Sequence, residues 1–145
     1  MNYKETLEYI HSIPKFNRVL GNALLEKLLN KMGNPQDNLK FIHIGGTNGK
    51  GSTCTMVSQI LTEAGYKTGL FTSPFLKFFN ERIKINGIPI SNSDLADIAS
   101  YVKNMTEKYD AFVSEFAFDT AVAFEYFNRQ NCDFVILEVG LGGKL

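Results

Sequence analysis

A run of glycines around one lysine is the part of this sequence with the clearest capacity for chemistry. It reads Gly-Gly-Thr-Asn-Gly-Lys-Gly-Ser over residues 45–52 and directly follows a short apolar run over residues 41–44. Glycines let the backbone curl so that successive N–H groups point at one anion. Lys50 can reach the terminal phosphates of a nucleotide, and the Ser52 hydroxyl can contact a phosphate or its magnesium ion. The stretch therefore predicts a phosphate-binding loop.

The spacing in this loop departs from the common pattern G-x-x-x-x-G-K-[ST]. Gly51 separates the lysine from the hydroxyl residue, and the leading glycine is out of frame. A glycine-rich turn that merely joins a strand to a helix is the alternative interpretation. Asn-Gly-Lys-Gly-Ser at a helix entrance favours phosphate binding, since the positive end of the helix dipole adds to the same spot. The nucleotide-binding residues expected are Thr47, Asn48, Gly49, Lys50, Gly51 and Ser52.

A second candidate is Glu138, which follows the fully apolar run over residues 134–137. Ligands of open α/β sheets bind at the carboxyl ends of the strands, which is where this carboxylate would lie. A magnesium ion beside a triphosphate is a natural partner for it. The alternative is an exposed carboxylate that simply ends the strand.

The helices and strands that must position these residues can be predicted from the spacing of apolar residues and from the residues that typically end helices and form turns. Apolar residues at helical spacing predict helices over residues 3–11, 24–32, 95–105 and 116–127. Apolar runs predict buried strands over residues 41–44, 68–72 and 134–137. Strands alternate with helices, so we expect an α/β fold with a mainly parallel sheet flanked by helices.

Two local signals refine this arrangement. Ser52 is expected to cap a helix that ends at Gly65, with a buried face formed by Met56, Val57, Ile60 and Leu61. Asn86-Gly87, between two short apolar runs, predicts a tight β-hairpin.

Composition limits the possible function. The 145 residues suit one domain, and 15 basic residues balance 15 acidic ones, so no net field favours nucleic acid or an anionic membrane. No signal peptide or membrane-length apolar stretch is visible. Cys54 and Cys132 form no metal or disulfide pattern and are expected to be buried thiols in the cytoplasm. His43 is expected in the core and His11 on the surface.

The loop variant G-T-N-G-K-G-S, taken with its surroundings, resembles the folate branch of the Mur ligase superfamily, which comprises folylpolyglutamate synthase and dihydrofolate synthase. Further matching motifs extend the resemblance over nearly the whole chain in the expected order. They are Gly33-Asn34-Pro35-Gln36, Thr72-Ser73-Pro74-Phe75-Leu76, Asn80-Glu81-Arg82-Ile83 and Glu138-Val139-Gly140-Leu141-Gly142-Gly143.

The resemblance implies a P-loop NTPase-like central domain and an ATP- and Mg²⁺-dependent ligase that adds L-glutamate to folate through an acyl phosphate. It implies catalytic roles for Lys50 and Glu138 and magnesium ligation by Ser73 and Glu138. A further family ligand, a histidine beyond the glutamate, has no counterpart in this sequence. Substrate-contact regions of the family correspond to Arg18, Glu115 and Phe116.

The family continues beyond the motif with which this sequence ends, so residues 1–145 are expected to form only the N-terminal part of the ATP-binding domain, without the C-terminal glutamate-binding domain. We expect this part to bind ATP but not to complete ligation, and the complete enzyme to be a monomer using folate or dihydropteroate. A non-catalytic nucleotide-binding subunit, or another Mur-type amide ligase, remains the alternative.

Overall fold

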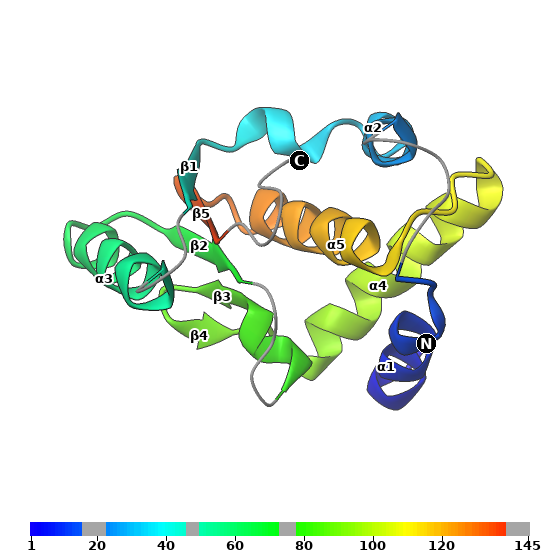
Figure 1. The fold of residues 1–145 in the computed structure, drawn as a ribbon, viewed down its shortest axis with the longest axis horizontal. Helices are drawn as coiled ribbons and strands as arrows, with labels where there is room; N and C mark the ends of the chain where they lie inside the picture. The colour runs from blue at the N-terminus through cyan, green and yellow to red at the C-terminus, as the bar shows by residue number, and fades with distance from the viewer. Residues whose placement is uncertain (16–22, 46–49, 73–77, 139–145) are drawn as a thin grey trace. The chain divides into compact units, whose positions relative to one another are not determined.

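The computed structural model describes residues 1–15, 23–45, 50–72 and 78–138 (Figure 1). The chain divides into two compact units, each made of two segments. Unit 1 combines residues 1–37 with residues 91–126 and consists mainly of helices; unit 2 combines residues 38–90 with residues 127–145 and contains the sheet. None of the helices within the described ranges is both long and apolar enough to cross a lipid bilayer.

Unit 2 is built on a five-stranded sheet with the order β1-β5-β2-β3-β4. Its strands are β1 (Phe41–Ile44), β2 (Thr68–Phe71), β3 (Ile83–Ile85), β4 (Ile88–Pro89) and β5 (Phe134–Glu138). Strands β1, β5 and β2 run parallel, whereas β3 is antiparallel to both β2 and β4. The mainly parallel sheet is thus confirmed, with an antiparallel hairpin added at one edge.

Helix α3 (Lys50–Glu63) covers one face of the parallel strands. Cys54 packs with Leu70 of β2 and Ile136 of β5 in a buried cluster, against which Val57 and Leu61 are partly buried. The helix ends as predicted at Gly65, whose φ of +97° suits a residue without a side chain. The backbone there closes with a hydrogen bond of 3.1 Å from the Tyr66 N–H to the Leu61 carbonyl.

The β3–β4 hairpin confirms the turn predicted from Asn86-Gly87. Both residues have positive φ, 50° and 79°, as a type I′ turn requires. Ile85 pairs with Ile88 on either side of the turn. The Asn86 side-chain oxygen also accepts a hydrogen bond of 2.9 Å from the N–H of Thr68, which ties the turn to the start of β2.

Unit 1 contains α1 (Tyr3–Ser12), α2 (Ala23–Lys31), α4 (Asn92–Lys108) and most of α5 (Glu115–Arg129), whose last turn belongs to unit 2. Helices α1 and α2 both pack on α4. Ser91 caps α4, and its hydroxyl accepts a 3.0 Å hydrogen bond from the Asp94 N–H. Residues 118–127 of α5 are all buried, so this Phe- and Ala-rich helix is enclosed on more than one side.

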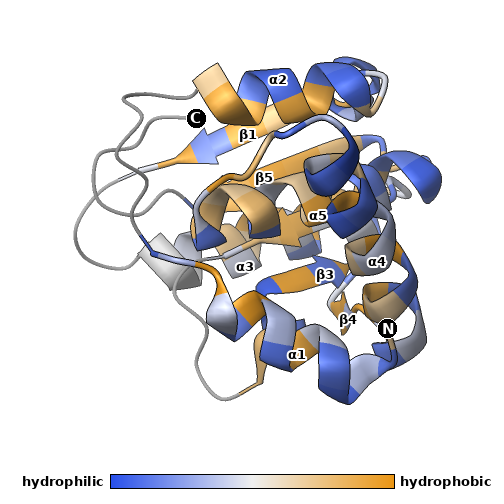
Figure 2. Ribbon diagram, turned by 90° about the vertical axis from the view of Figure 1, so that its right-hand side faces the viewer, coloured by the Kyte–Doolittle hydropathy of each residue, from blue (hydrophilic) through white to orange (hydrophobic). Residues whose placement is uncertain are grey.

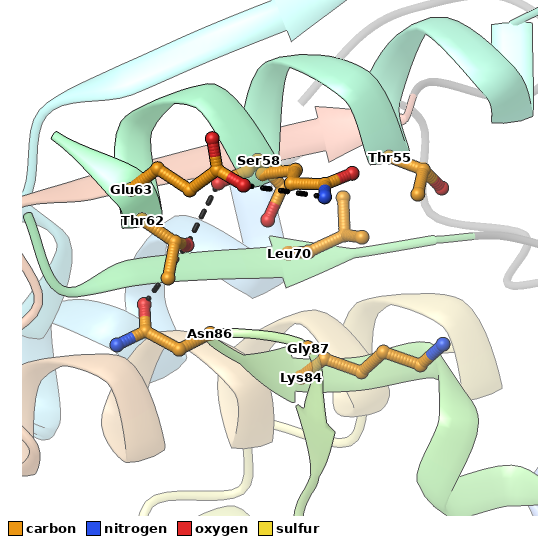
Figure 3. Close-up of a pocket in the computed structure, with 9 residues that line it drawn as sticks. Thr55, Ser58, Thr62, Glu63, Leu70, Lys84, Asn86 and Gly87 are labelled. Atoms are coloured by element: carbon orange, nitrogen blue, oxygen red, sulfur yellow. Dashed lines mark hydrogen bonds between the residues drawn. The ribbon is translucent and has the colours of Figure 1, made fainter.

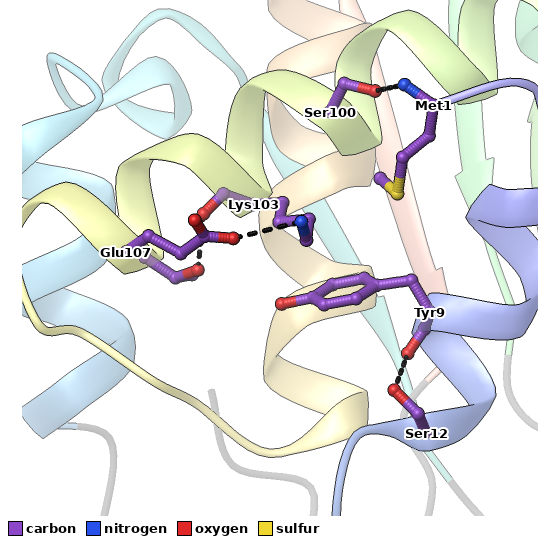
Figure 4. A network of polar contacts seen from close by, with 7 residues as sticks. Met1, Tyr9, Ser12, Ser100, Lys103 and Glu107 are labelled. Atoms are coloured by element: carbon purple, nitrogen blue, oxygen red, sulfur yellow. Dashed lines mark hydrogen bonds and ion pairs between the residues drawn. The ribbon is translucent and has the colours of Figure 1, made fainter.

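Polar contacts hold α1 against α4 (Figure 4). The N-terminal ammonium of Met1 donates a 3.0 Å hydrogen bond to the Ser100 hydroxyl. Lys103 forms an ion pair of 3.1 Å with Glu107, and its ammonium also lies 5.2 Å from the centre of the Tyr9 ring. These contacts fix the start of the chain on the longest helix of the described residues.

Three expectations about burial and capping are wrong. Ser52 does not cap α3, because the helix already includes Lys50. Met56 and Ile60 are 61% and 59% exposed, since they lie on the side of α3 turned away from the sheet. His43 is exposed and β1 only half-buried, because β1 lies at the sheet edge. Figure 2 accordingly colours β5 hydrophobic and β1 partly hydrophilic.

Candidate nucleotide site

The strand register brings the end of β1 beside Glu138. Strands β1, β5 and β2 are parallel, so their carboxyl ends meet at one edge of the sheet. Ile44, the last residue of β1, pairs with Glu138, the last residue of β5. On the other side of β5, Phe71 at the end of β2 pairs with Leu137. The strand that leads into the glycine-rich segment therefore ends at the position paired with Glu138.

Helix α3 begins where that segment ends. Its first residue is Lys50, so residues 45–49 must connect the end of β1 to the start of the helix. The first turn of a helix leaves backbone N–H groups without partners inside the helix and carries the positive end of its dipole. The buried cluster around Cys54 holds the helix on the sheet. An anion at this edge would therefore meet a fixed, electropositive helix end.

Glu138 is suited to hold a magnesium ion next to such an anion. It is half-buried at the end of a strand whose preceding three residues, Val135 to Leu137, are buried. The described residues contain no group of three or more His, Cys, Asp or Glu side chains that could form a complete metal cage. Magnesium commonly uses one or two protein ligands together with phosphate oxygens and water, so a single carboxylate near the predicted phosphate-binding segment fits this ion.

The structure places some predicted site residues and leaves others outside its description. Lys50, Gly51 and Ser52 form the first turn of α3. Thr47, Asn48, Gly49, Ser73 and Arg18 lie outside the described residues.

The expected substrate residues Glu115 and Phe116 open α5 in unit 1. Glu115 is half-buried, and its N–H donates a 3.0 Å hydrogen bond to the Pro14 carbonyl. Phe116 is 37% exposed. The exposed ring remains a candidate for contact with a flat ligand.

Arg82 is a residue whose role the sequence did not reveal. Its side chain is only 6% exposed and donates a 3.3 Å hydrogen bond from Nε to the Thr72 carbonyl. The guanidinium lies 5.7 Å from the centre of the Phe71 ring and 5.4 Å from that of Phe79. The Thr72 N–H in turn donates to the Arg82 carbonyl over 2.9 Å. Arg82 thus fixes the backbone immediately before Ser73.

Asn80, in the turn that precedes β3, makes a buried contact with the residue that follows β4. Its side-chain amide donates a 2.7 Å hydrogen bond to the Ile90 carbonyl, and the residue is 8% exposed. The motif Asn80-Glu81-Arg82-Ile83 was available in the sequence, but only its tertiary contacts assign it this anchoring role.

No family model matches the chain, but curated proteins similar to it share related names. Folylpolyglutamate synthase of Lacticaseibacillus casei is 40% identical over 99% of this chain, and dihydrofolate synthase/folylpolyglutamate synthase of Bacillus subtilis is 40% identical over 98%. The chain spans about a third of the length of these relatives, 35% and 34% respectively.

Solved structures that resemble this chain carry the same name, folylpolyglutamate synthase or its abbreviation FPGS. One described as an FPGS-AMPPCP-folate complex superposes with a TM-score of 0.91 at 40% identity, covering 99% of this chain and 36% of that one. Folylpolyglutamate synthase of Thermotoga maritima superposes with a TM-score of 0.86 at 44% identity, covering 97% of this chain and 33% of that one.

Proposed function

We propose that this chain, a homologue of folylpolyglutamate and dihydrofolate synthases over its whole length, provides the ATP-binding part of a ligase that adds L-glutamate to a folate. The proposal rests on one juxtaposition. The start of α3, the end of β1 and the Glu138 carboxylate lie at one edge of the sheet, in a chain that is 40% identical to an enzyme solved with AMPPCP and folate.

The residues of the chain have distinct proposed tasks. Backbone N–H groups of the segment over residues 45–52, with the Lys50 ammonium, would offset charge on the γ-phosphoryl group as it transfers. Glu138, with Ser73, would hold Mg²⁺, which when bound neutralises the phosphates and orients them for attack. Thr72 and Arg82 would keep Ser73 at its place by their mutual hydrogen bonds.

The proposed reaction has two steps. A carboxylate oxygen of the folate attacks the γ-phosphorus of ATP, releasing ADP and leaving an acyl phosphate. The amine of L-glutamate then attacks the acyl carbon, phosphate leaves with the bonding electrons, and the nitrogen loses a proton. Phosphorylation is needed because an oxygen of the free carboxylate is a poor leaving group, whereas phosphate is a good one. With dihydropteroate as acceptor the product is dihydrofolate, and with a reduced folate it is a longer polyglutamate.

The proposed acceptor-binding residues are Arg18, Glu115 and Phe116, of which the last two lie at the exposed start of α5. We place the complete enzyme in the cytoplasm as a monomer, without nucleic acid or membrane partners. The buried thiols Cys54 and Cys132 suit a reducing compartment. A nucleotide-binding subunit without catalysis is the second candidate, because the chain covers only about a third of its relatives.

Calorimetric titration of MgATP into the purified 145-residue chain tests the nucleotide site. Saturable heat that is lost in Lys50→Ala would support the proposal. Lys31→Ala, which removes an exposed lysine near the end of α2, is the matched control and should bind like the parent. Absence of binding in a chain that circular dichroism shows to be folded would refute an ATP site in these residues.

A further inference from the structure

A cavity lies between α3 and the β3–β4 hairpin, away from the strand ends that carry the nucleotide site (Figure 3). Helix α3 packs on β1, β5 and β2. Lys84 of β3 pairs with Leu70 of β2 in the antiparallel register, so its side chain emerges on the same face of the sheet as the α3 core. The uncovered strip beside the helix forms a cavity with a volume of about 390 Å³.

Hydrogen bonds hold the cavity walls together. The Thr62 hydroxyl donates 2.7 Å to the Ser58 carbonyl and lies 3.2 Å from the Asn86 side-chain oxygen, which links α3 to the hairpin. The same Asn86 oxygen accepts the Thr68 N–H. Ser58 and Leu70, both 6% exposed, form the deeper part of the lining. The cavity is therefore built by contacts that exist without a ligand.

Opposite charges lie toward opposite ends of this cavity. Figure 3 shows the Lys84 ammonium on the side of Thr55, whereas the Glu63 carboxylate lies on the side of Thr62. Thr55 and Glu63 are eight residues apart on one helix, so these sides are separated by roughly 12 Å. Gln59 donates a 3.4 Å hydrogen bond to the Glu63 carboxylate and helps to position it. Leu70 supplies an apolar surface between the charges.

We propose that this cavity binds a small linear zwitterion, with the ligand carboxylate at Lys84, its ammonium at Glu63 and its apolar middle over Leu70. The volume lies at the lower end of the range for small-molecule sites, which suits a ligand between an amino acid and a dipeptide in size. The inference depends only on α3, β2 and the hairpin, so it can be tested separately from ATP binding.

The probe is 6-aminohexanoate, followed by amide chemical-shift changes in ¹H–¹⁵N NMR spectra of the 145-residue chain. Hexanoate, which lacks the ammonium, and hexylamine, which lacks the carboxylate, are the matched ligands. We expect saturable shifts centred on Ser58, Thr62 and Gly87, with roughly three- to tenfold weaker binding of both matched ligands. Equal binding of all three, no binding of the zwitterion, or shifts centred elsewhere would overturn the proposal.

Charge variants separate the cavity from general electrostatics. Lys84→Met and Glu63→Gln each remove one charge from a side chain that is not fully buried, so both should fold, and each should weaken the zwitterion roughly three- to tenfold. Lys27→Met and Glu26→Gln, at exposed positions of α2 outside the cavity, should change nothing. If the α2 variants weaken zwitterion binding as much as the cavity variants do, the ligand does not bind in the cavity. Binding should persist in Lys50→Ala.

Discussion

Individual residues in unit 2 owe their behaviour to close neighbours in space. Gly69 lies in β2 with the buried ring of Phe127 packed over it, whereas Cys132 lies buried just before β5. Neither the ring packed over Gly69 nor the burial of Cys132 can be predicted from the residue type alone. Substituting each residue and measuring the free energy of unfolding tests the effect of these neighbours.

Gly69→Ala should destabilise the chain. The added Cβ would lie 2.8 Å from Cδ1 of Phe127, closer than carbon atoms can pack, and the ring is fully buried. We expect a loss of about 1–3 kcal/mol in the free energy of unfolding, measured by urea denaturation. In the double variant with Phe127→Leu, the loss should be smaller than the sum of the two single losses, since a smaller side chain relieves the clash. Strict additivity would contradict this account.

Cys132 should make stability depend on alkaline pH. Burial raises the pKa of its thiol to about 11, with Asp133 also raising it and Lys67 lowering it. The thiol of the unfolded chain has the lower pKa, near 9. Stability is therefore complete below pH 9 and declines as the pH rises from 9 to 11, because the unfolded state loses the proton first. Urea denaturation between pH 9 and 11 should show the decline in the parent chain, and Cys132→Ala should remove the part that this thiol contributes. If stability depends on pH in Cys132→Ala as it does in the parent chain, the thiol is not the cause.

At the scale of elements, the hairpin contributes to both sites that we propose. Its turn residue Asn86 closes one wall of the zwitterion cavity, and Arg82 just before β3 holds the backbone that leads to Ser73. The turn has positive φ at two successive positions, which lets β4 fold back and pair with β3, while β3 itself pairs with β2.

Gly87→Ala should weaken this element. Gly87 has a φ of +79°, which costs a residue with a Cβ about 1–2 kcal/mol. We expect a loss of that size in thermal or urea unfolding. Gly45→Ala is the matched control, because the added methyl would meet no atom of the described residues within 4 Å and no left-handed backbone is required there. A loss as large in Gly45→Ala as in Gly87→Ala would argue against the turn as the cause.

At the scale of the whole molecule, the chain contains two compact units and spans about a third of the relatives it matches. The sheet of unit 2 pairs the end of β1 with Glu138, and residues 45–49 connect β1 to the start of α3; the proposed phosphate site depends on this arrangement. The proposed ligation also needs sites for a folate and for glutamate, and the second of these has no candidate among the residues described.

We therefore predict that the 145 residues alone bind MgATP but do not release phosphate in a manner that depends on glutamate and folate. Calorimetry measures the first property and a coupled phosphate assay measures the second. A full-length relative such as the Bacillus subtilis enzyme serves as the positive control. Glutamate-dependent phosphate release by the purified chain would show that these residues suffice for the reaction.

Local features of this protein could be predicted because they depend on neighbours in sequence. The Asn86-Gly87 turn and the Gly65 helix end both follow from backbone preferences and short-range hydrogen bonds. The strand and the helix on either side of the proposed phosphate loop were also predicted, and both are present as β1 and α3.

Burial was predicted less well, because it depends on which elements pack together. His43, Met56 and Ile60 have residue types and spacings that suit a core, yet all three are exposed. One helix covers only one face of a sheet, and an edge strand has a partner on one side only.

The sequence by itself determined the types of the main elements and their order, and it supplied the residues that we propose bind phosphate, because propensities and motifs act over a few residues. Only the tertiary structure decided that Arg82 anchors the backbone before Ser73 and that Lys84 shares a cavity with Glu63. Those relations join segments distant in sequence, and strand pairing and packing energies, summed over the whole sheet, bring them together.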